Sequence, residues 1–338
     1  MSTVLSEDLL GQAAGLERTG MWDEAAEVYA DAFRAAAAAG DLPFLVKVLR
    51  GESNLRRSQE RHAEAEELAR LRLEIAERNG LADEVARATN LLAALRHCQG
   101  DLAGAQALYH TALERARQLR DHDLAGAICL NLGVVANMRG EVGEARALYL
   151  ECIAASVRSG NESNKLMAYN NLGMLCADLR EWLESDLYFD RGIEIARRLD
   201  DRPMLGKLYA NNAEPLIHMG ELARAAALLD RAEEVAGPLG DSATVALSAR
   251  FRAVLARIAG EFKVADGHLA RAAALAQGEG LELERTEILG GLARLRWEQG
   301  RRDEARAALH EARERFAALG AAREIRRLDE VLAAWQTD

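Results

Sequence analysis

Apolar side chains recur at intervals of three and four residues along most of the chain, and short turn signals interrupt this pattern at regular distances. The spacing keeps apolar residues on one helical face, so it predicts amphipathic helices of roughly 14 to 18 residues with a turn after each. Pro occurs only four times and aromatic residues make up 5% of the chain, which favours helices over sheets. The sequence therefore predicts an all-α protein.

The turn signals form two columns when the chain is written in rows of forty residues. The first column is Gly20, Glu60, Gly100, Gly140, Arg180, Gly220, Gly260 and Gly300. The second is Gly40, Gly80, Arg120, Gly160, Asp200, Gly240, Gly280 and Gly320. Gly can take the left-handed conformation that ends a helix, and a following Asp or Asn can cap the next one. Five residues fit such a cap: Asp41, Asp121, Asn161, Asp201 and Asp241.

Two further columns predict how the helices pack. Five residues after the first turn column stand Ala25, Ala65, Ala105, Ala145, Ser185, Ala225, Ala265 and Ala305. A large residue follows in most rows, namely Tyr29, Tyr109, Tyr149, Phe189, Leu229, Leu269 and Leu309. Small residues let two helices approach closely, and a large side chain fills the hole between successive hairpins. Stacked hairpins therefore bury the apolar faces of their helices, which no single helix could bury alone.

These columns resemble the tetratricopeptide repeat family, and the clearest copy runs from Asn131-Leu132-Gly133 through Gly140, Ala145 and Tyr149 to Cys152. The next copy contains Asn171-Leu172-Gly173, Trp182, Ser185 and Phe189. The resemblance implies a right-handed α-solenoid of eight helix-turn-helix repeats plus a C-terminal capping helix. The period of forty exceeds the usual ~34, and the closing Pro of the motif is missing. The HEAT and armadillo families have similar periods but do not explain the Leu-Gly and Ala columns.

We expect one domain over residues 1–338. Its repeats run approximately over 6–45, 46–85, 86–125, 126–165, 166–205, 206–245, 246–285 and 286–320, followed by a cap over 321–338. The cap places Ile325, Leu328, Leu332 and Trp335 on one face and charged residues on the other, as a terminal repeat requires. Repeat two is the weakest copy, since Glu60, His62 and Ala69 replace its usual residues.

Proline marks one irregular helix. Pro215 lies well inside the first helix of repeat six, where it lacks a backbone donor and clashes with the carbonyl of Asn211, so a kink is predicted. Pro43 and Pro203 follow turns and are expected to start helices. The kink at Pro215 is either merely tolerated or shapes a binding surface.

The net charge and the absence of known motifs argue against several classes of function. The net charge of −11 disfavours direct binding to nucleic acid or to anionic membranes. The first ten residues lack a signal-peptide pattern and no apolar run approaches ~18 residues, so we expect a cytoplasmic protein. Basic charge is almost all Arg, which suggests a bacterial source. The four cysteines have no paired spacing, and no catalytic or phosphate-binding motif occurs, so we expect no metal, cofactor or enzymatic activity.

The resemblance also implies a concave groove lined by the first helix of each repeat. Its positions in the repeat of Gly133 are 127, 130, 131, 134, 137 and 138, and they recur every forty residues. They place Lys47, Arg50, Asn54, Arg57, Arg87, Asn90 and His97 in the groove without one acidic residue. The full set of expected peptide-binding residues is Lys47, Arg50, Asn54, Arg57, Arg87, Asn90, Asn131, Asn170, Asn171, Lys207, Asn211 and Glu214.

The groove changes character toward the C-terminus, where the same positions hold Leu247, Phe251, Val254 and Ile258 beside Arg250 and Arg257. Amides such as Asn131, Asn171 and Asn211 offer a donor and an acceptor to an extended peptide backbone. The leading hypothesis is an adaptor or scaffold that binds a protein or peptide with an acidic segment. The alternative is a sensor module of a bacterial regulator in which a ligand or signalling peptide changes superhelix curvature. A homo-oligomer is possible, but nothing in the residues demands it.

Overall fold

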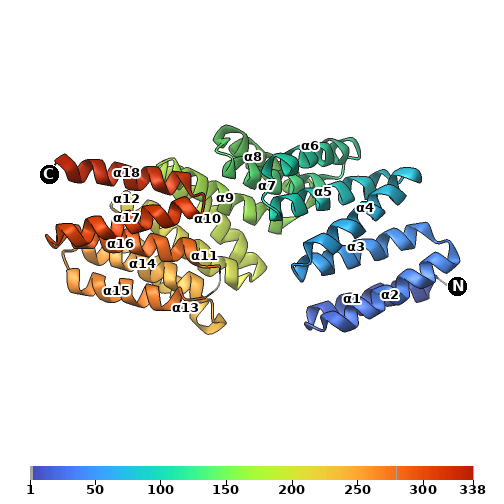
Figure 1. The fold of residues 1–338 in the computed structure, drawn as a ribbon, viewed down its shortest axis with the longest axis horizontal. Coiled ribbons are helices and arrows are strands. Elements are labelled where there is room, and N and C mark those ends of the chain that lie inside the picture. The colour runs from blue at the N-terminus through green and yellow to red at the C-terminus, as the bar shows by residue number, and fades with distance from the viewer. Residues whose placement is uncertain (1–2, 279, 338) are drawn as a thin grey trace. The chain divides into compact units, whose positions relative to one another are not determined.

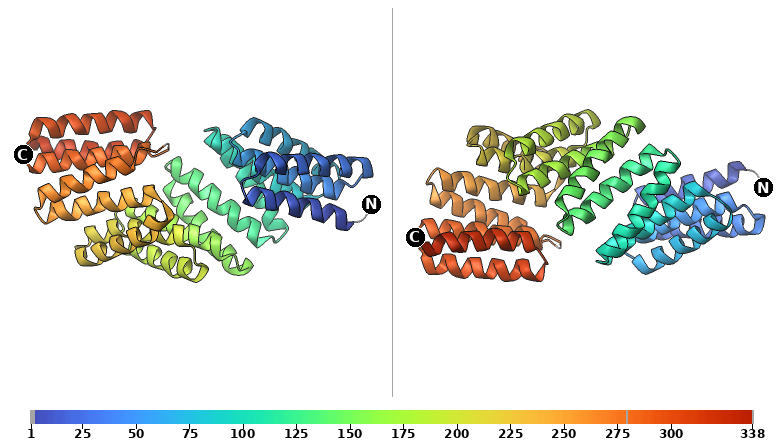
Figure 2. Two further views of the ribbon diagram at one scale, coloured as in Figure 1. Left: turned by 90° about the horizontal axis from the view of Figure 1, so that it is seen from below. Right: turned by 90° about the horizontal axis from the view of Figure 1, so that it is seen from above.

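The computed structural model describes residues 3–278 and 280–337, and every regular element in these ranges is a helix. The helices form antiparallel hairpins (Figures 1 and 2). Their bounds are α1 Thr3–Arg18, α2 Trp22–Ala39, α3 Leu42–Ser58, α4 His62–Arg78, α5 Ala82–Cys98, α6 Leu102–Gln118, α7 His122–Met138, α8 Val142–Ser159, α9 Glu162–Asp178, α10 Trp182–Leu199, α11 Arg202–Asn211, α12 Ala213–His218, α13 Leu222–Ala236, the 3₁₀ turn η1 Gly237–Leu239, α14 Ser242–Ile258, α15 Phe262–Leu275, α16 Glu282–Glu298, α17 Arg302–Ala318 and α18 Ala322–Thr337.

The chain divides into two compact units, Met1–Ala168 and Tyr169–Asp338, and the boundary falls inside α9. The expectation of one domain over residues 1–338 stays a prediction. Each repeat is one hairpin, and its first helix begins directly after the second turn column. The expected repeat boundaries at residues 46 and 86 therefore lie about one helical turn inside α3 and α5.

The two turn columns are confirmed at every position. All of their members have a positive φ, from 52° at Asp200 to 80° at Gly100. Four of them are not glycine, namely Glu60, Arg120, Arg180 and Asp200, although this conformation is strained for residues with a Cβ. The next helix is capped by a side chain where the sequence predicts it. The carboxylate of Asp121, for example, accepts the backbone N–H of Leu124 at 2.9 Å.

The packing columns are also confirmed. Every member of the small-residue column, from Ala25 to Ala305, has 0% exposure. Tyr149 packs so closely on Gly133 that a Cβ on that glycine would lie 2.6 Å from a ring carbon, and Phe189 stands in the same relation to Gly173 at 2.7 Å. The Leu-Gly pair is thus required where an aromatic ring presses against the first helix of its own hairpin.

The kink at Pro215 is confirmed, because the first helix of repeat six is broken into α11 and α12 at Asn212. Counting these halves as one helix, the described residues contain the seventeen α-helices that eight repeats and a cap predict. Pro43 and Pro203 lie in the first turns of α3 and α11. The break lies directly before α12, which carries Glu214 in its first turn and His218 in its last.

Helix α18 packs its apolar face on the last hairpin. Leu328 and Trp335 are buried there, and the indole of Trp335 stacks on that of Trp297 with ring centres 4.2 Å apart. Ile325 and Leu332 are partly buried in the same cluster. None of the helices in the part of the chain that the structure describes has the length and apolar character needed to span a bilayer.

Candidate functional site

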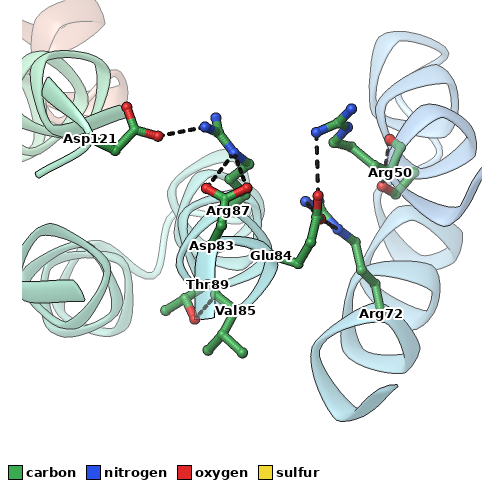
Figure 3. A network of polar contacts seen from close by, with 9 residues as sticks. Arg50, Arg72, Asp83, Glu84, Val85, Arg87, Thr89 and Asp121 are labelled. Carbon is green, nitrogen blue, oxygen red and sulfur yellow. Dashed lines mark hydrogen bonds and ion pairs between the residues drawn. The ribbon is translucent and has the colours of Figure 1, made fainter. Parts of the chain in front are cut away.

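The basic stretch expected in repeats two and three carries internal ion pairs (Figure 3). Arg50 on α3 lies 3.4 Å from the carboxylate of Glu84 on α5. The same carboxylate accepts a hydrogen bond from Nε of Arg72 on α4 at 2.9 Å. Glu84 therefore joins three consecutive helices and neutralises positive charge on their surface.

Arg87 is held in the same way. Its guanidinium contacts Asp83, one turn earlier on α5, at 3.0 Å and Asp121, the N-cap of α7, at 2.5 Å (Figure 3). The groove positions of repeats two and three hold no acidic residue, but carboxylates from outside them, on Asp83, Glu84 and Asp121, pair with Arg50 and Arg87. The reason is the stacking of repeats, which brings the start of each first helix beside the middle of the preceding one. Arg50 and Glu84 are 34 residues apart, and so are Arg87 and Asp121. This repeated spacing between an arginine and a carboxylate is the feature of the sequence that could have predicted both ion pairs.

The other predicted residues of the N-terminal unit lie separately. Lys47 and Arg57 are exposed, while Asn54, Asn90 and Asn131 are half-buried. The Oδ1 atom of Asn90 is buried and has no hydrogen-bond partner among the described residues. No contact that would assemble these side chains into one binding site connects them within the described ranges.

Three predicted amides meet in the C-terminal unit. Asn170 is buried on α9, donates to Oδ1 of Asn171 at 3.2 Å and accepts a hydrogen bond from Nδ2 of Asn211 at 3.3 Å. These bonds use part of the amide capacity that the sequence reasoning assigned to a peptide backbone. Lys207 is exposed on α11, and Glu214 lies on the next half-helix, α12.

A hollow of about 710 Å³ lies in the C-terminal unit. Its walls come mainly from the first helices of repeats six to eight and from the cap. They include Glu214, Ile217 and His218 of α12, Arg250, Phe251, Ala253, Val254, Arg257 and Ile258 of α14, Glu287, Gly290, Gly291, Arg294 and Leu295 of α16, and Arg327, Leu328, Glu330 and Val331 of α18.

The hollow coincides with the groove positions that the repeat pattern indicates. Every wall residue from α12, α14 and α16 belongs to one of the six recurring positions, except Ala253 and Leu295. The wall includes the apolar residues Phe251, Val254 and Ile258 that the sequence mapping names, although Leu247 is not among them. Extending the mapping into repeat eight would also have found Arg294, which the sequence reasoning missed.

The cap borders the hollow by returning to the end of the first helix of repeat five. The guanidinium of Arg327 on α18 lies 3.3 Å from the carboxylate of Asp178, the last residue of α9. Arg180, in the turn after α9, lies 2.5 Å from Glu330 on α18. These contacts join residues about 150 positions apart, so the four C-terminal repeats and the cap form one closed turn around the hollow.

An aromatic stack forms part of the wall. The rings of Trp182 and His218 are 4.1 Å apart and nearly parallel, at 7°. Burial lowers the pKa of His218 from its ordinary value, and the carboxylate of Glu214 opposes this shift. The imidazole is therefore mainly neutral near pH 7, and the stack offers the hollow a flat, largely apolar surface.

Residues 84–156 match the tetratricopeptide repeat family model. The chain is similar in fold to the apo form of RapI, with 14% identity over 81% of this chain and 99% of that one and a TM-score of 0.66. A Rap protein complexed with competence and sporulation factor gives 14% identity, 97% and 99% coverage and a TM-score of 0.58. A STAND signal transduction ATPase with a tetratricopeptide repeat sensor, from Pyrococcus horikoshii, gives 15% identity, 79% and 41% coverage and a TM-score of 0.66.

No curated protein sequence shows significant similarity to the chain. Identities as low as those of the solved structures establish a common fold and nothing further about ligands or activity. The family match and the repeat columns agree with that fold in every feature described above. Residues 84–156 are therefore tetratricopeptide repeats, and the described helices on either side continue the same hairpin with a period of forty residues.

Proposed function

We propose that this chain is a cytoplasmic bacterial adaptor or scaffold, not an enzyme, and that the hollow of its C-terminal unit holds a peptide segment of a partner protein. The observation that carries the proposal is the composition of the hollow's walls, which come from the groove positions of α12, α14 and α16. Its volume of about 710 Å³ lies within the range of sites that enclose a small ligand or a few peptide residues.

The wall chemistry suits a peptide. Phe251, Val254 and Ile258 on α14 supply apolar contact, and Arg294 on α16 supplies positive charge to the same hollow. A few polar groups on a mainly apolar wall fix the orientation of a ligand while the apolar groups contribute contact area. An acidic segment with apolar neighbours therefore matches the hollow better than a basic one.

The arginines predicted to bind a peptide in the N-terminal groove have a structural role in this proposal. Arg50 and Arg87 carry carboxylate partners of their own, so we assign them to holding repeats two to four together. Asn171 and Asn211 keep unused hydrogen-bonding capacity in the C-terminal unit. We propose that they extend the peptide site along α9 and α11.

A sensor is the second candidate function, and the closed turn favours it. A ligand that enters the hollow beside the contacts Arg327–Asp178 and Arg180–Glu330 can displace α18 and so signal its presence. The similar Rap protein is complexed with competence and sporulation factor, and the similar ATPase carries its repeats as a sensor. These are properties of those two proteins, and they support the candidate by analogy.

The test fills the hollow with a bulky side chain. Val254→Trp places an indole inside it, and Val264→Trp makes the same exchange at a half-exposed site on α15, away from the walls. Both variants and the native chain are used to capture partners from the source organism, and binding of a peptide from the captured protein is then measured by calorimetry. We expect the native chain and Val264→Trp to bind alike and Val254→Trp to lose binding. Equal binding by all three, with folding intact, would place the site elsewhere.

Hydrogen exchange separates the two candidates. In a sensor, a bound peptide changes the protection of α18 and of the end of α9 near Asp178, because the closing contacts are rearranged. In an adaptor, protection increases along the hollow walls while α18 keeps its contacts. The measurement uses the native chain with and without the captured partner's peptide.

A further inference from the structure

The arginines in the wall of the hollow differ in whether they have a carboxylate partner. Arg250 donates through Nε to Glu284 at 2.8 Å, and Arg257 pairs with Glu298. Arg180 and Arg327 take part in the contacts that close the turn. Arg294 on α16 makes no salt bridge or hydrogen bond with any residue that the structure describes, and its side chain is exposed to the interior of the hollow.

The repeat geometry explains why Arg294 lacks a partner. A carboxylate 34 positions later neutralises Arg50, Arg87 and Arg250 in their respective repeats. Arg294 stands one helical turn further along its helix than Arg50 and Arg250 do in theirs. The residue 34 positions later, Leu328, therefore falls in the buried middle of the next helix and not at its carboxylate-bearing start.

The electrostatic environment of Arg294 differs accordingly. Burial is the largest effect and lowers the pKa of its guanidinium, and the carboxylate of Glu287 opposes this shift. The cations of Arg257, Arg250 and Arg327 lower it further. For Arg250, by contrast, burial is outweighed by the carboxylates of Glu284 and Glu287, and its pKa rises. Burial and three neighbouring cations therefore outweigh Glu287, the carboxylate that favours the charged form of Arg294.

We infer that Arg294 is an anchor for an oxyanion group, a carboxylate or a phosphate, on the ligand of the hollow. The planar guanidinium fork matches either group with two parallel hydrogen bonds. Phe251 and Val254 on α14 flank the same space and would contact apolar atoms beside the anion. The inference rests on the proposed peptide function for the nature of the ligand but not for the anion site itself.

Glu214 gives the site a direction. It occupies the same repeat position as Val254 and Arg294, on α12, and contributes a carboxylate to the hollow. Helix α14 packs against both α12 and α16. An anionic group is repelled by Glu214 on the α12 wall and by Glu287 on the α16 wall, so the acidic end of a peptide is directed toward Arg294.

The first experiment uses inorganic phosphate as the probe and requires no peptide. Calorimetric titrations compare the native chain with Arg294→Gln and with a matched control, Arg231→Gln, which removes an exposed arginine on α13 outside the hollow walls. We expect Arg294→Gln to weaken phosphate binding by about tenfold or more, since a charge-assisted hydrogen bond is lost, and Arg231→Gln to leave it unchanged. Circular dichroism confirms that all three chains are folded.

The second experiment identifies the source of the anion with hexaglutamate, hexaglutamine and a hexapeptide containing one phosphoserine among glutamines. We expect at least one acidic peptide to bind the native chain more tightly than hexaglutamine does. Its affinity should fall by about tenfold or more with Arg294→Gln, and this loss should be larger than any loss for hexaglutamine. Tighter binding of hexaglutamate identifies a carboxylate, and tighter binding of the phosphopeptide identifies a phosphate.

The outcomes separate this inference from the proposed function. Phosphate binding that depends on Arg294, with no binding of any peptide, supports the anion site and overturns the peptide function. A partner peptide that binds the native chain and Arg294→Gln equally supports the peptide function and overturns the anion site. Failure of the native chain to bind phosphate and both acidic peptides overturns the anion site as well.

Discussion

Arg72 and Glu84 form an ion pair that joins the second helix of repeat two to the first helix of repeat three. Arg72 is 1% exposed and stands where the first and third repeats have Ala32 and Ala112. The large residue expected three positions earlier is Ala69, so repeat two exchanges the sizes of its two packing residues. The exchange fills the space but buries a cation, and Glu84 supplies the counter-charge.

Removing that counter-charge should destabilise the protein strongly. Glu84→Gln leaves Arg72 buried without a carboxylate, and breaking a buried pair in this way costs about 3 to 5 kcal/mol. Asp83→Asn is the matched control, since Asp83 is next in sequence but its pair with Arg87 is largely exposed, and we expect a loss of at most about 1 kcal/mol. Urea denaturation followed by circular dichroism measures both. Equal losses would contradict the role assigned to Glu84.

The turn columns predict stabilising substitutions. Glu60 and Arg120 hold a positive φ that glycine adopts without strain, so Glu60→Gly and Arg120→Gly should each raise the free energy of unfolding by up to about 1 kcal/mol. Gly100→Ala should lower it by about 1 kcal/mol for the opposite reason. Gly143→Ala is the control, because Gly143 lies in α8 with open space around a new Cβ, and there the added methyl should stabilise the helix.

Pro215 should lower the free energy of unfolding while giving the hollow the shape that binds a ligand. Pro215→Ala restores a backbone donor and lets α11 and α12 form one straight helix, with an expected gain of about 1 to 3 kcal/mol. The same change moves Glu214 and His218, so ligand binding in the hollow should fall. Pro43→Ala, at the start of α3, should change neither property much. A gain in stability with unaltered binding would show that the kink is only tolerated.

Glu233 predicts a pH dependence of stability. Hydrogen bonds and charge from Arg271 and Arg252 outweigh the effect of burial and lower the pKa of this carboxylate. A lowered folded-state pKa stabilises the fold above the unfolded-state value of about 4.3, and this contribution is lost as pH falls through the folded-state pKa. Glu233→Gln should therefore be less stable than the native chain at pH 7 and should approach it in acid. A difference that grows toward acid pH would reverse this assignment.

The cap should protect the last hairpin. A chain ending at Gly320 loses the stack of Trp335 on Trp297 and uncovers the apolar face of α16 and α17. We expect faster hydrogen exchange in α17, a red-shifted tryptophan emission and a tendency to aggregate, while exchange in the N-terminal unit stays unchanged. Unchanged exchange in α17 would contradict the capping role.

Local features of the fold could be predicted from the sequence. Turns, caps and the small and large packing columns depend on residues a few positions apart, and forty-residue periodicity aligns them without a gap. The constraint is strong enough that Glu60 and Arg180 keep the left-handed conformation of their column. The groove positions follow from the same register, and they correctly named Phe251, Val254 and Ile258 as residues of one concave surface.

The charge of that surface depended on tertiary structure. Arg50, Arg250 and Arg294 occupy groove positions in similar helices, yet the first two lie beside carboxylates 34 residues later. Arg294 stands one turn further along its helix, and the residue at that offset is the buried Leu328. The closed turn around the hollow likewise depends on α18 reaching Asp178. The sequence determined each helix and its buried face because those follow from local spacing. Packing between repeats decided which charges are neutralised, because Coulomb interactions depend on distances that sequence separation does not give.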